Sequence, residues 1–152
     1  MIKPFSIEDS EDCKEIISRC FDESVIIEEK ARQYIKKRYM KNGYFLRESA
    51  KYPIFVYKKR GKAIAIAGIK ENMIKKFYVH PDEQGKGIGK ELLHYLERIA
   101  FKNKYKEIIL DSYDNSLNFY ISHGYSINKK FVREWDGVKI PITIMKKKIT
   151  KE

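Results

Sequence analysis

Residues 73–100 constrain the fold most, because a strand pattern and a helix pattern meet there around three closely spaced glycines. Residues 73–80 are rich in strand-forming side chains, and Pro81 ends the strand because it has no N–H for the ladder. The loop that follows reads Gln84-Gly85-Lys86-Gly87-Ile88-Gly89-Lys90. Apolar residues then recur at helical spacing, namely Leu92, Leu93, Leu96, Ile99 and Ala100. The sequence therefore predicts a strand, a glycine-rich loop and an amphipathic helix in direct succession.

The composition of this loop predicts a cradle for a pyrophosphate group. Glycine has no side chain, so the backbone at positions 85, 87 and 89 can approach a ligand closely and point its N–H groups into one concavity. The N-terminus of the following helix adds about half a positive charge and free N–H donors. Lys86 and Lys90 supply full positive charges.

The glycine spacing excludes two common phosphate-binding motifs. A nucleoside-triphosphate loop needs four residues between its glycines and then Lys-Ser/Thr, whereas three residues separate Gly85 from Gly89 and Glu91 follows Lys90. A dinucleotide fingerprint needs G-x-G-x-x-G, and the G-x-G-x-G found here is one residue short. A merely flexible loop is the remaining alternative. Each glycine inside a helix start, however, lowers helix stability by up to about 1 kcal/mol relative to alanine, so we expect a compensating interaction.

The whole chain alternates strand and helix patterns without repeats, low-complexity tracts or a flexible linker, so we predict a single domain over residues 1–152. The order β-α-α-β-β-β-α-β-α-β-β mixes hairpins with one strand–helix–strand crossover. This order predicts an α/β (α+β) fold in which a mixed central β-sheet of about seven strands is flanked by about four helices. Strands are expected at about 2–6, 54–58, 63–69, 73–80, 108–110, 126–135 and 138–148.

Turn and cap residues set the boundaries of these elements. Ser6 and Asp9 form a capping box at the start of the first helix. Ser24 is predicted to cap a second helix, which Asn42-Gly43 ends. Asp136-Gly137 predicts a two-residue hairpin turn between the last two strands.

Charge is distributed unevenly along the chain. Thirty-two Lys and Arg residues against 21 Asp and Glu residues give a formal net charge of +11. Residues 8–29 carry nine acids against two bases, whereas residues 30–62 carry twelve bases against one acid. A basic balance is typical of binding to nucleic acid, a membrane surface or a small anion, or of a solvated lysine-rich surface. Because no helix-turn-helix, zinc or RNA-binding motif accompanies it, we expect no nucleic-acid partner.

Several other classes of site lack support in the sequence. No apolar stretch reaches the ~18 residues of a membrane-spanning helix, and the first residues lack a secretion signal, so we expect a cytoplasmic protein with no membrane partner. Cys13 and Cys20 would lie ~10 Å apart along a helix, too far for a disulfide, and are predicted to be buried hydrophobes. His80, His94 and His123 lack metal-ligand spacing, so no metal site is predicted.

Two motifs in residues 73–125 resemble those of GCN5-related N-acetyltransferases (GNAT). The run from Gln84 to Gly89 is similar to the family signature Q/R-x-x-G-x-G/A. Downstream, Ser116-Leu117-Asn118-Phe119-Tyr120 and then Gly124-Tyr125 resembles the family segment A-x-x-F-Y-x-x-x-G-F. Ser116 in place of Ala and Tyr125 in place of Phe are mild departures from that segment.

The resemblance implies a GNAT fold with a site for acetyl-CoA as cosubstrate and no metal. Family members bind the pyrophosphate on the loop amides and pair the pantetheine arm with the edge of the preceding strand, whose unpaired backbone groups suit an amide-bearing ligand. The N–H of Val79 would then donate to the thioester carbonyl. The implied cofactor-binding residues are Phe77, Tyr78, Val79, Gln84, Gly85, Lys86, Gly87, Ile88, Gly89, Lys90 and Asn115.

The implied reaction is direct attack of a neutral amine on the thioester. Tyr120 matches the general acid of the family, because a phenol with its ordinary pKa near ~10 is protonated at pH 7 and can donate to sulfur. Glu71, at the start of the strand that precedes the loop, is the first candidate for the general base. Asp111, Glu28 or Glu29, and a bound water remain alternatives.

These features predict an acetyl-CoA-dependent N-acetyltransferase that acts on a primary amine of a small molecule or a protein, as a monomer or homodimer. A catalytically inactive CoA-binding module of the same fold, acting as a sensor or interaction subunit, is the alternative, and the retained Tyr120 argues against it. The acidic run at 22–29 is predicted to attract a cationic amine acceptor. Trp135 and Tyr113 are candidates to line the acceptor cleft.

Overall fold

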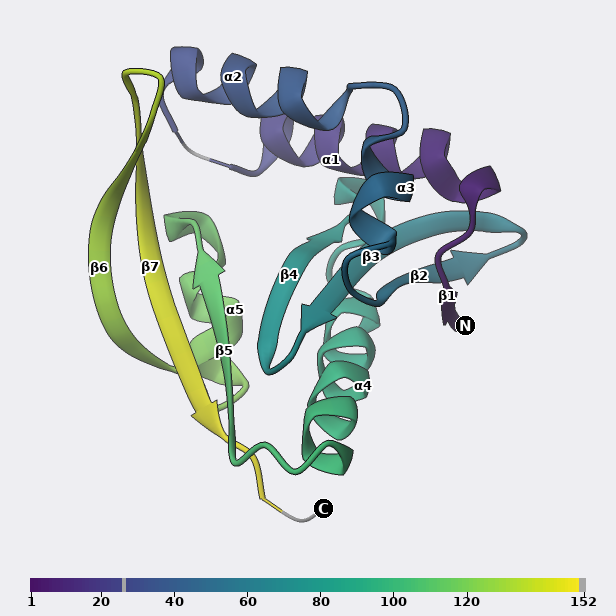
Figure 1. Cartoon of the computed structure of the whole chain (residues 1–152), viewed down its shortest axis with the longest axis vertical. Coiled ribbons are helices and arrows are strands. Elements are labelled where there is room, and N and C mark those ends of the chain that lie inside the picture. The colour runs from purple at the N-terminus through teal and green to yellow at the C-terminus, as the bar shows by residue number, and fades with distance from the viewer. Residues whose placement is uncertain (26, 151–152) are drawn as a thin grey trace.

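The computed structural model describes residues 1–25 and 27–150. Its strands are β1 (Ile2–Pro4), β2 (Ile54–Lys59), β3 (Lys62–Lys70), β4 (Met73–Val79), β5 (Glu107–Ser112), β6 (Ser126–Trp135) and β7 (Val138–Lys148). Its α-helices are α1 (Ser10–Glu23), α2 (Glu29–Tyr39), α3 (Tyr44–Ser49), α4 (Ile88–Lys102) and α5 (Leu117–Ser122). The strands form one mixed sheet in the order β1-β2-β3-β4-β5-β7-β6 (Figure 1). The predicted sheet is therefore confirmed, with one more helix than expected.

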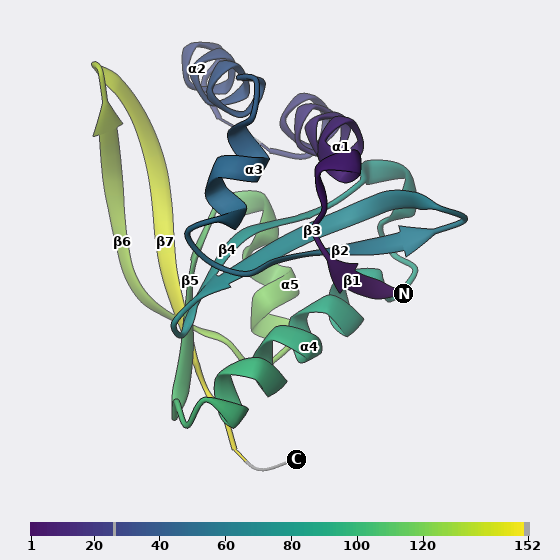
Figure 2. The same cartoon turned by 45° about the vertical axis from the view of Figure 1, so that its right-hand side comes forward.

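The helices cover both faces of the sheet. Helices α1, α2 and α3 lie on one face, and α4 and α5 lie on the other (Figure 2). The core under α1–α3, here called the α1 core, includes Ile17, Phe21, Ile35, Phe45 and Ile66. The core under α4 and α5, here called the α4 core, includes Ile74, Leu92, Leu93, Leu96, Ile108 and Tyr120. No helix in the described residues combines the length and the apolar character needed to cross a bilayer.

The parallel strands β4 and β5 pair over only a short length. The two strands pair at only two positions, Met73 with Ile109 and Ile74 with Leu110, whereas the other neighbouring strands are antiparallel. Beyond this contact β4 and β5 separate toward their carboxyl ends (Figure 1). The backbone groups of β4 that face the opening therefore have no partner in the ladder.

A β-bulge interrupts β4 beside this opening. Tyr78 pairs with Ile66 and Lys75 pairs with Gly68, so Lys76 and the next residue together face a single residue of β3. Lys76 has a left-handed backbone with φ of 55°. Bulges of this kind re-aim side chains and are common beside functional sites.

The predicted capping box is present, but it caps a 3₁₀ turn that leads into α1. The Ser6 N–H donates to Asp9 Oδ2 at 2.9 Å, and the turn covers Ile7–Asp9, whereas α1 begins at Ser10 without a side-chain cap. Cys13 and Cys20 are free and buried on the apolar face of α1, as predicted.

The predicted boundaries of α2 are wrong at both ends. Ser24 does not cap α2; its N–H donates to the Cys20 carbonyl oxygen and ends α1. Helix α2 ends at Tyr39, and Gly43, with φ of 73°, precedes α3 instead of ending α2. Helix α3 was not predicted because six residues are too few to show a helical period in the sequence.

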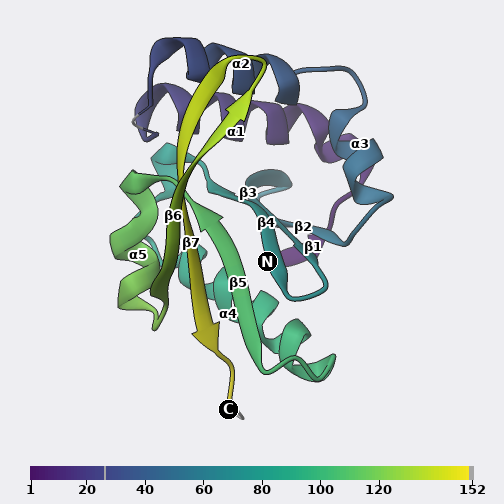
Figure 3. The same ribbon diagram turned by 60° about the vertical axis from the view of Figure 1, so that its left-hand side comes forward.

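The hairpin between β6 and β7 confirms the turn predicted at Asp136-Gly137. Both turn residues have positive φ, 48° and 78°, as a two-residue turn of the type I′ class requires. The tip of the hairpin lies beside α2 (Figure 3), where the Tyr34 ring stacks on Trp135 with centroids 6.1 Å apart. The Tyr34 hydroxyl donates to Asp136 at 3.0 Å. These contacts attach the hairpin to α2.

Lys76 and Glu48 form an ion pair surrounded by tyrosine rings. Lys76 Nζ lies 3.0 Å from Glu48 Oε1 and 5.4–5.9 Å from the centroids of the Tyr39, Tyr44 and Tyr52 rings. Burial by itself raises the pKa of Glu48, but hydrogen bonds from Lys51, Lys76 and Tyr52 outweigh it and lower that pKa to about 2.

Replacing Glu48 by Gln is expected to lower the free energy of unfolding by about 2 kcal/mol, because Lys76 then lacks its carboxylate. The folded-state pKa of Glu48 lies below its ordinary value of 4.5, so its contribution is complete above about pH 4.5 and disappears as the pH falls toward 2. The Tm difference between wild type and Glu48→Gln should shrink over that interval in thermal unfolding. The control Glu107→Gln removes an exposed partner 3.7 Å from Lys146 and should change stability by less than about 0.5 kcal/mol. Equal losses in both variants would contradict this account.

Candidate functional site

A cavity of about 580 Å³ occupies the opening between β4 and β5. It is lined by the carboxyl-terminal end of α1, by β4, by the glycine-rich loop, by β5 and by residues 113–123. Since both the α1 core and the α4 core adjoin this opening, the cavity is bordered from both faces of the sheet. In the part of the chain that the structure describes, no three His, Cys, Asp or Glu side chains gather as a metal site.

Most of the cofactor-binding residues predicted from the sequence line this cavity. They are Phe77, Tyr78, Val79, Gln84, Gly85, Gly87, Gly89, Lys90 and Asn115. Two predicted side chains do not line it. The Lys86 ammonium lies 3.3 Å from Glu83 Oε1, and Ile88 is buried in the α4 core.

The three loop glycines are required for two different reasons. Gly85 and Gly87 have φ of 79° and 85°, and a Cβ at either would meet no atom within 4 Å. Gly89 has an ordinary φ, but its Cβ would lie 3.1 Å from Phe119 Cζ. The first two glycines therefore allow a left-handed backbone beside an open concavity, and the third lets α4 start against α5.

The start of α4 faces this concavity with free amides. Gly87 is the N-cap of α4 and provides no side-chain cap, so the first N–H groups of the helix have no side-chain acceptor within the described residues. Uncapped amides at a helix N-terminus, with the positive end of its dipole, are suited to an anionic ligand. Lys90, which lines the cavity, adds a positive charge in the first turn.

Val79 presents its N–H to the opening. The His80 N–H donates to the Ile64 carbonyl oxygen of β3 at 2.8 Å. Along an antiparallel strand, successive N–H groups point alternately toward and away from the neighbouring strand. The Val79 N–H therefore points away from β3, toward β5. The Val79 carbonyl oxygen accepts hydrogen bonds from the Cys20 thiol at 3.1 Å and from Gln84 Nε2 at 3.0 Å. Gln84, which the sequence assigned to the cofactor, thus fixes the loop to the end of β4.

Tyr120 brings a phenol into the same cavity. Its side chain is 4% exposed and packs against the Phe77 and Tyr125 rings, with centroids 5.9 and 5.7 Å away. Its hydroxyl oxygen forms no hydrogen bond within residues 1–25 and 27–150, but it is not fully enclosed by neighbouring atoms. The hydroxyl therefore opens into the cavity that Tyr120 lines. Burial raises the pKa of Tyr120 above its ordinary value of 10, so the phenol remains protonated at neutral pH.

The structure does not bring Glu71 to the cavity. Glu71 is exposed in the turn between β3 and β4, at the opposite end of β4 from Val79. Glu28 and Glu29 are exposed at the start of α2 and do not line the cavity either. The strands predicted from the sequence gave the order of these residues along the chain, but they did not show at which end of the sheet the cavity opens.

Asp111 is the one carboxylate among the described residues that line the cavity. Its Oδ2 accepts a hydrogen bond from Arg133 Nη2 at 2.9 Å. The sequence analysis ranked Asp111 below Glu71 because the resemblance to the family favours a carboxylate or a water relay at the start of the strand that precedes the loop. The lining also includes Lys76, which the sequence did not indicate because a bulge cannot be recognised from the residue pattern of β4.

Comparisons with known proteins identify the family. A family model described as "Acetyltransferase (GNAT) domain" matches residues 11–149. The chain therefore belongs to the GNAT acetyltransferase family. A search of curated protein sequences gave no match.

Solved structures agree on the fold. A GCN5-related N-acetyltransferase from Rhodopseudomonas palustris is similar over 97% of this chain and 94% of that one, with 20% identity and a TM-score of 0.91. The PaiA N-acetyltransferase from Thermoplasma acidophilum, solved with coenzyme A, is 25% identical over 97% of this chain and 98% of that one, with a TM-score of 0.75. YncA from Salmonella typhimurium, solved with acetyl-CoA, is 18% identical over 100% and 95%, with a TM-score of 0.66. The architecture described above is the GNAT fold.

Gly87→Glu is expected to weaken coenzyme A binding by about 100-fold or more, because a carboxylate enters the concavity where the diphosphate would lie. Gly61→Glu is the matched control, since Gly61 has φ of 76° and a Cβ there also meets no atom within 4 Å. Both variants carry the same backbone strain, so only Gly87→Glu should lose binding in calorimetric titration. Unchanged affinity in Gly87→Glu would reject the cradle.

Proposed function

We propose that this protein transfers an acetyl group from acetyl-CoA to a primary amine by direct attack in a ternary complex. The observation that carries this proposal is the opening between β4 and β5. There the free Val79 N–H, the Tyr120 hydroxyl and the glycine loop border one cavity. The presence of coenzyme A or acetyl-CoA in two proteins of the same fold supports the choice of cosubstrate.

Acetyl-CoA would be held mainly by backbone groups. The amides of residues 85–90, with Lys90, suit the diphosphate, because both the helix start and the lysine favour negative charge. The unpaired edge of β4 suits the amide groups of the pantetheine arm. The part of the cavity on the α1 side is here called the acceptor side, and it is lined by Cys20, Ser24, Tyr78, Asp111 and Tyr113.

The reaction follows from these positions. The amine nitrogen attacks the thioester carbon, the C–N bond forms, and the Val79 N–H donates to the developing oxyanion. The C–S bond then breaks, and the Tyr120 hydroxyl gives its proton to the departing CoA thiolate. Asp111 accepts the proton that the amine loses, directly or through a water. The products are the N-acetylated amine and CoA.

Acetyl-CoA titration followed by an amine screen tests this proposal. Calorimetric binding of acetyl-CoA, together with amine-dependent release of free CoA, is the expected result. Binding of acetyl-CoA without CoA release from any primary amine would instead favour the inactive module. The polar groups retained in the cavity, Tyr120 and Asp111, favour the enzyme.

Tyr120→Phe is expected to lower kcat by about 10- to 100-fold with little change in acetyl-CoA affinity, because only the proton donor to sulfur is lost. Tyr125→Phe is the matched control. The Tyr125 ring lies next to Tyr120, but its hydroxyl donates to Glu97 at 2.8 Å, and neither residue lines the cavity. That variant should lose stability but keep its turnover. Equal kcat values for wild type and Tyr120→Phe would reduce Tyr120 to a packing residue.

Asp111→Asn is expected to lower kcat/KM at neutral pH by about 100-fold, because the amide still accepts from Arg133 but takes no proton from the amine. Glu71→Gln, remote from the cavity, distinguishes the two candidate bases in the same assay. A loss of rate in Glu71→Gln with an unaffected Asp111→Asn would assign the base to Glu71.

A further inference from the structure

The acidic run at 22–29 does not reach the cavity. None of its four carboxylates is among the residues that line the cavity. Three of them are compensated by neighbouring bases within the fold. The ion pairs are Asp22 with Lys36, Glu23 with Arg19, and Glu29 with Arg32. The nature of the acceptor therefore has to be inferred from the side chains that line the acceptor side.

The charged side chains of the cavity leave no free partner for a charged acceptor group. Among the described residues, the Lys, Arg, Asp and Glu side chains that line it are those of Lys76, Lys90 and Asp111. Lys76 pairs with Glu48 at 3.0 Å, and Asp111 pairs with Arg133 at 2.9 Å. Lys90 lies in the first turn of α4, beside the glycine loop. A second charge on the acceptor, positive or negative, would therefore lose its hydration without gaining a partner.

Two tyrosine rings, here called the tyrosine wall, line the acceptor side. Tyr78 lies near the end of β4 and Tyr113 follows β5 directly, and both side chains line the cavity and are partly exposed. Their ring centroids lie 5.8 and 5.6 Å from the centroid of the Phe21 ring, which is fully buried in the α1 core. Each of the two separating strands thus contributes one aromatic ring to the same side of the opening.

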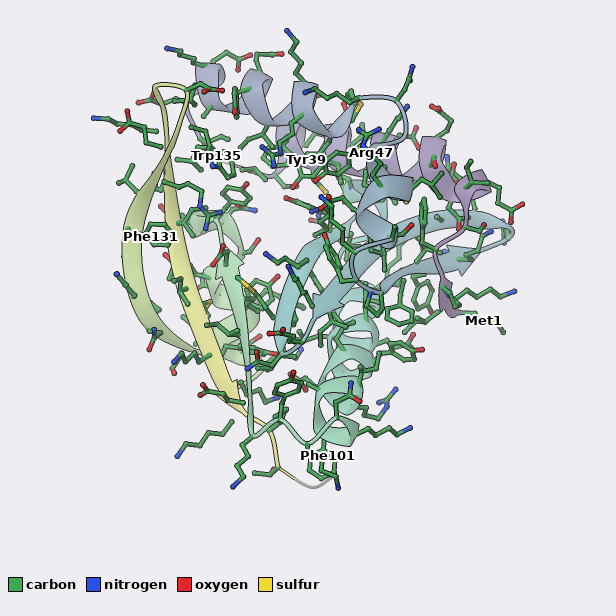
Figure 4. The ribbon with its side chains drawn as sticks, in the orientation of Figure 1. Met1, Tyr39, Arg47, Phe101, Phe131 and Trp135 are labelled. Carbon is green, nitrogen blue, oxygen red and sulfur yellow. The ribbon has the colours of Figure 1, made fainter. Side chains whose placement is uncertain are left out.

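Neighbouring rings hold the tyrosine wall in place. Figure 4 shows Tyr39 below α2, and its ring centroid lies 6.2 Å from that of Tyr78 and 6.2 Å from that of Phe21. Burial raises the pKa of both Tyr78 and Tyr113, so the two phenols are uncharged at neutral pH. The tyrosine wall is therefore a preorganised aromatic surface without charge.

Trp135, the other aromatic candidate from the sequence, is not part of this surface. It is not among the residues that line the cavity, and its ring stacks on Tyr34 at the tip of the β6–β7 hairpin. Tyr113, in contrast, lies where the sequence predicted it.

The other neutral side chains of the acceptor side are small. Cys20, Ser24 and Val25 line it from the end of α1 and the segment that follows. Burial raises the pKa of Cys20 to about 12, so its side chain remains a thiol at neutral pH. A thiol and a valine methyl group are apolar neighbours for a ring that lies on the tyrosine wall.

We propose that the acceptor is a small monoamine whose amino group is joined to an uncharged aromatic body, and that this body packs against Tyr78 and Tyr113 while the amine faces Asp111. This inference rests on the proposed N-acetyltransferase activity. Aromatic rings gain from stacked or edge-to-face contact with other rings beyond the burial of apolar area. Asp111 provides for one ammonium group that must lose its proton, and no second carboxylate lines the cavity in the described residues.

A series of four amines tests the preference. The far end of each molecule is aromatic in 2-phenylethylamine, saturated in 2-cyclohexylethylamine, cationic in 1,4-diaminobutane and anionic in 4-aminobutanoate. The kcat/KM for CoA release, corrected for the fraction of each amine that is neutral, is the quantity compared. It should be about tenfold or more higher for 2-phenylethylamine than for either charged amine. It should exceed that for 2-cyclohexylethylamine by about 3- to 10-fold, because the saturated ring has no π-system.

Variants of Tyr113 assign the preference to the tyrosine wall. Tyr113→Leu keeps an apolar side chain but removes the ring, so the ratio of 2-phenylethylamine to 2-cyclohexylethylamine should fall close to one. Tyr113→Phe keeps the ring and should keep the ratio. Tyr105→Leu is the matched control, since Tyr105 packs against the α4 core and does not line the cavity. Calorimetric titration of acetyl-CoA shows whether each variant is folded, and the wild-type series decides alone if Tyr113→Leu is not.

The outcomes separate this inference from the proposed function. A higher rate with either charged amine, equal rates with the aromatic and the saturated ring, or a ratio that a folded Tyr113→Leu leaves unchanged would overturn the inference while the transferase activity stands. Binding of acetyl-CoA with no acetylation of any amine would overturn the proposed function and this inference with it.

Discussion

The incomplete pairing of β4 with β5 is the constraint on which the rest of the structure depends. Two parallel strands meet at two positions and then separate, leaving backbone donors and acceptors without a strand partner. An unpaired backbone group that is buried costs on the order of 1–3 kcal/mol, so such an opening persists only where a ligand or water can satisfy it. The cavity is therefore a consequence of the topology of the sheet before any side chain is considered.

Main-chain groups build one side of this cavity and side chains build the other. The loop amides, the start of α4 and the Val79 N–H depend on three glycines and on close packing between Gly89 and Phe119, and on little else. The acceptor side depends instead on particular side chains, Asp111 and Tyr113 among them.

Local signals in the sequence were sufficient where one short segment decides the outcome. The Ser6–Asp9 capping box, the Asp136-Gly137 turn and the glycine loop each encode their own geometry, and the structure has all three. Ser24 was misassigned because a serine between two helices can either end the first or begin the second, and packing decides between them. Helix α3 was missed because it is held by the burial of Tyr44 and Phe45 and not by periodicity.

The sequence by itself determined the GNAT family, the mixed sheet and the glycine loop, because these follow from residue types at fixed spacing within continuous segments. Only the tertiary structure decided which carboxylate faces the cavity, since Glu71 lies before the β4–β5 contact and Asp111 lies directly after it, where the strands separate. It also decided which charges around the cavity are paired, namely Lys76 with Glu48 and Asp111 with Arg133. These ion pairs join residues distant in sequence, and Lys76 lies in a β-bulge, so neither is encoded in the local pattern of residues.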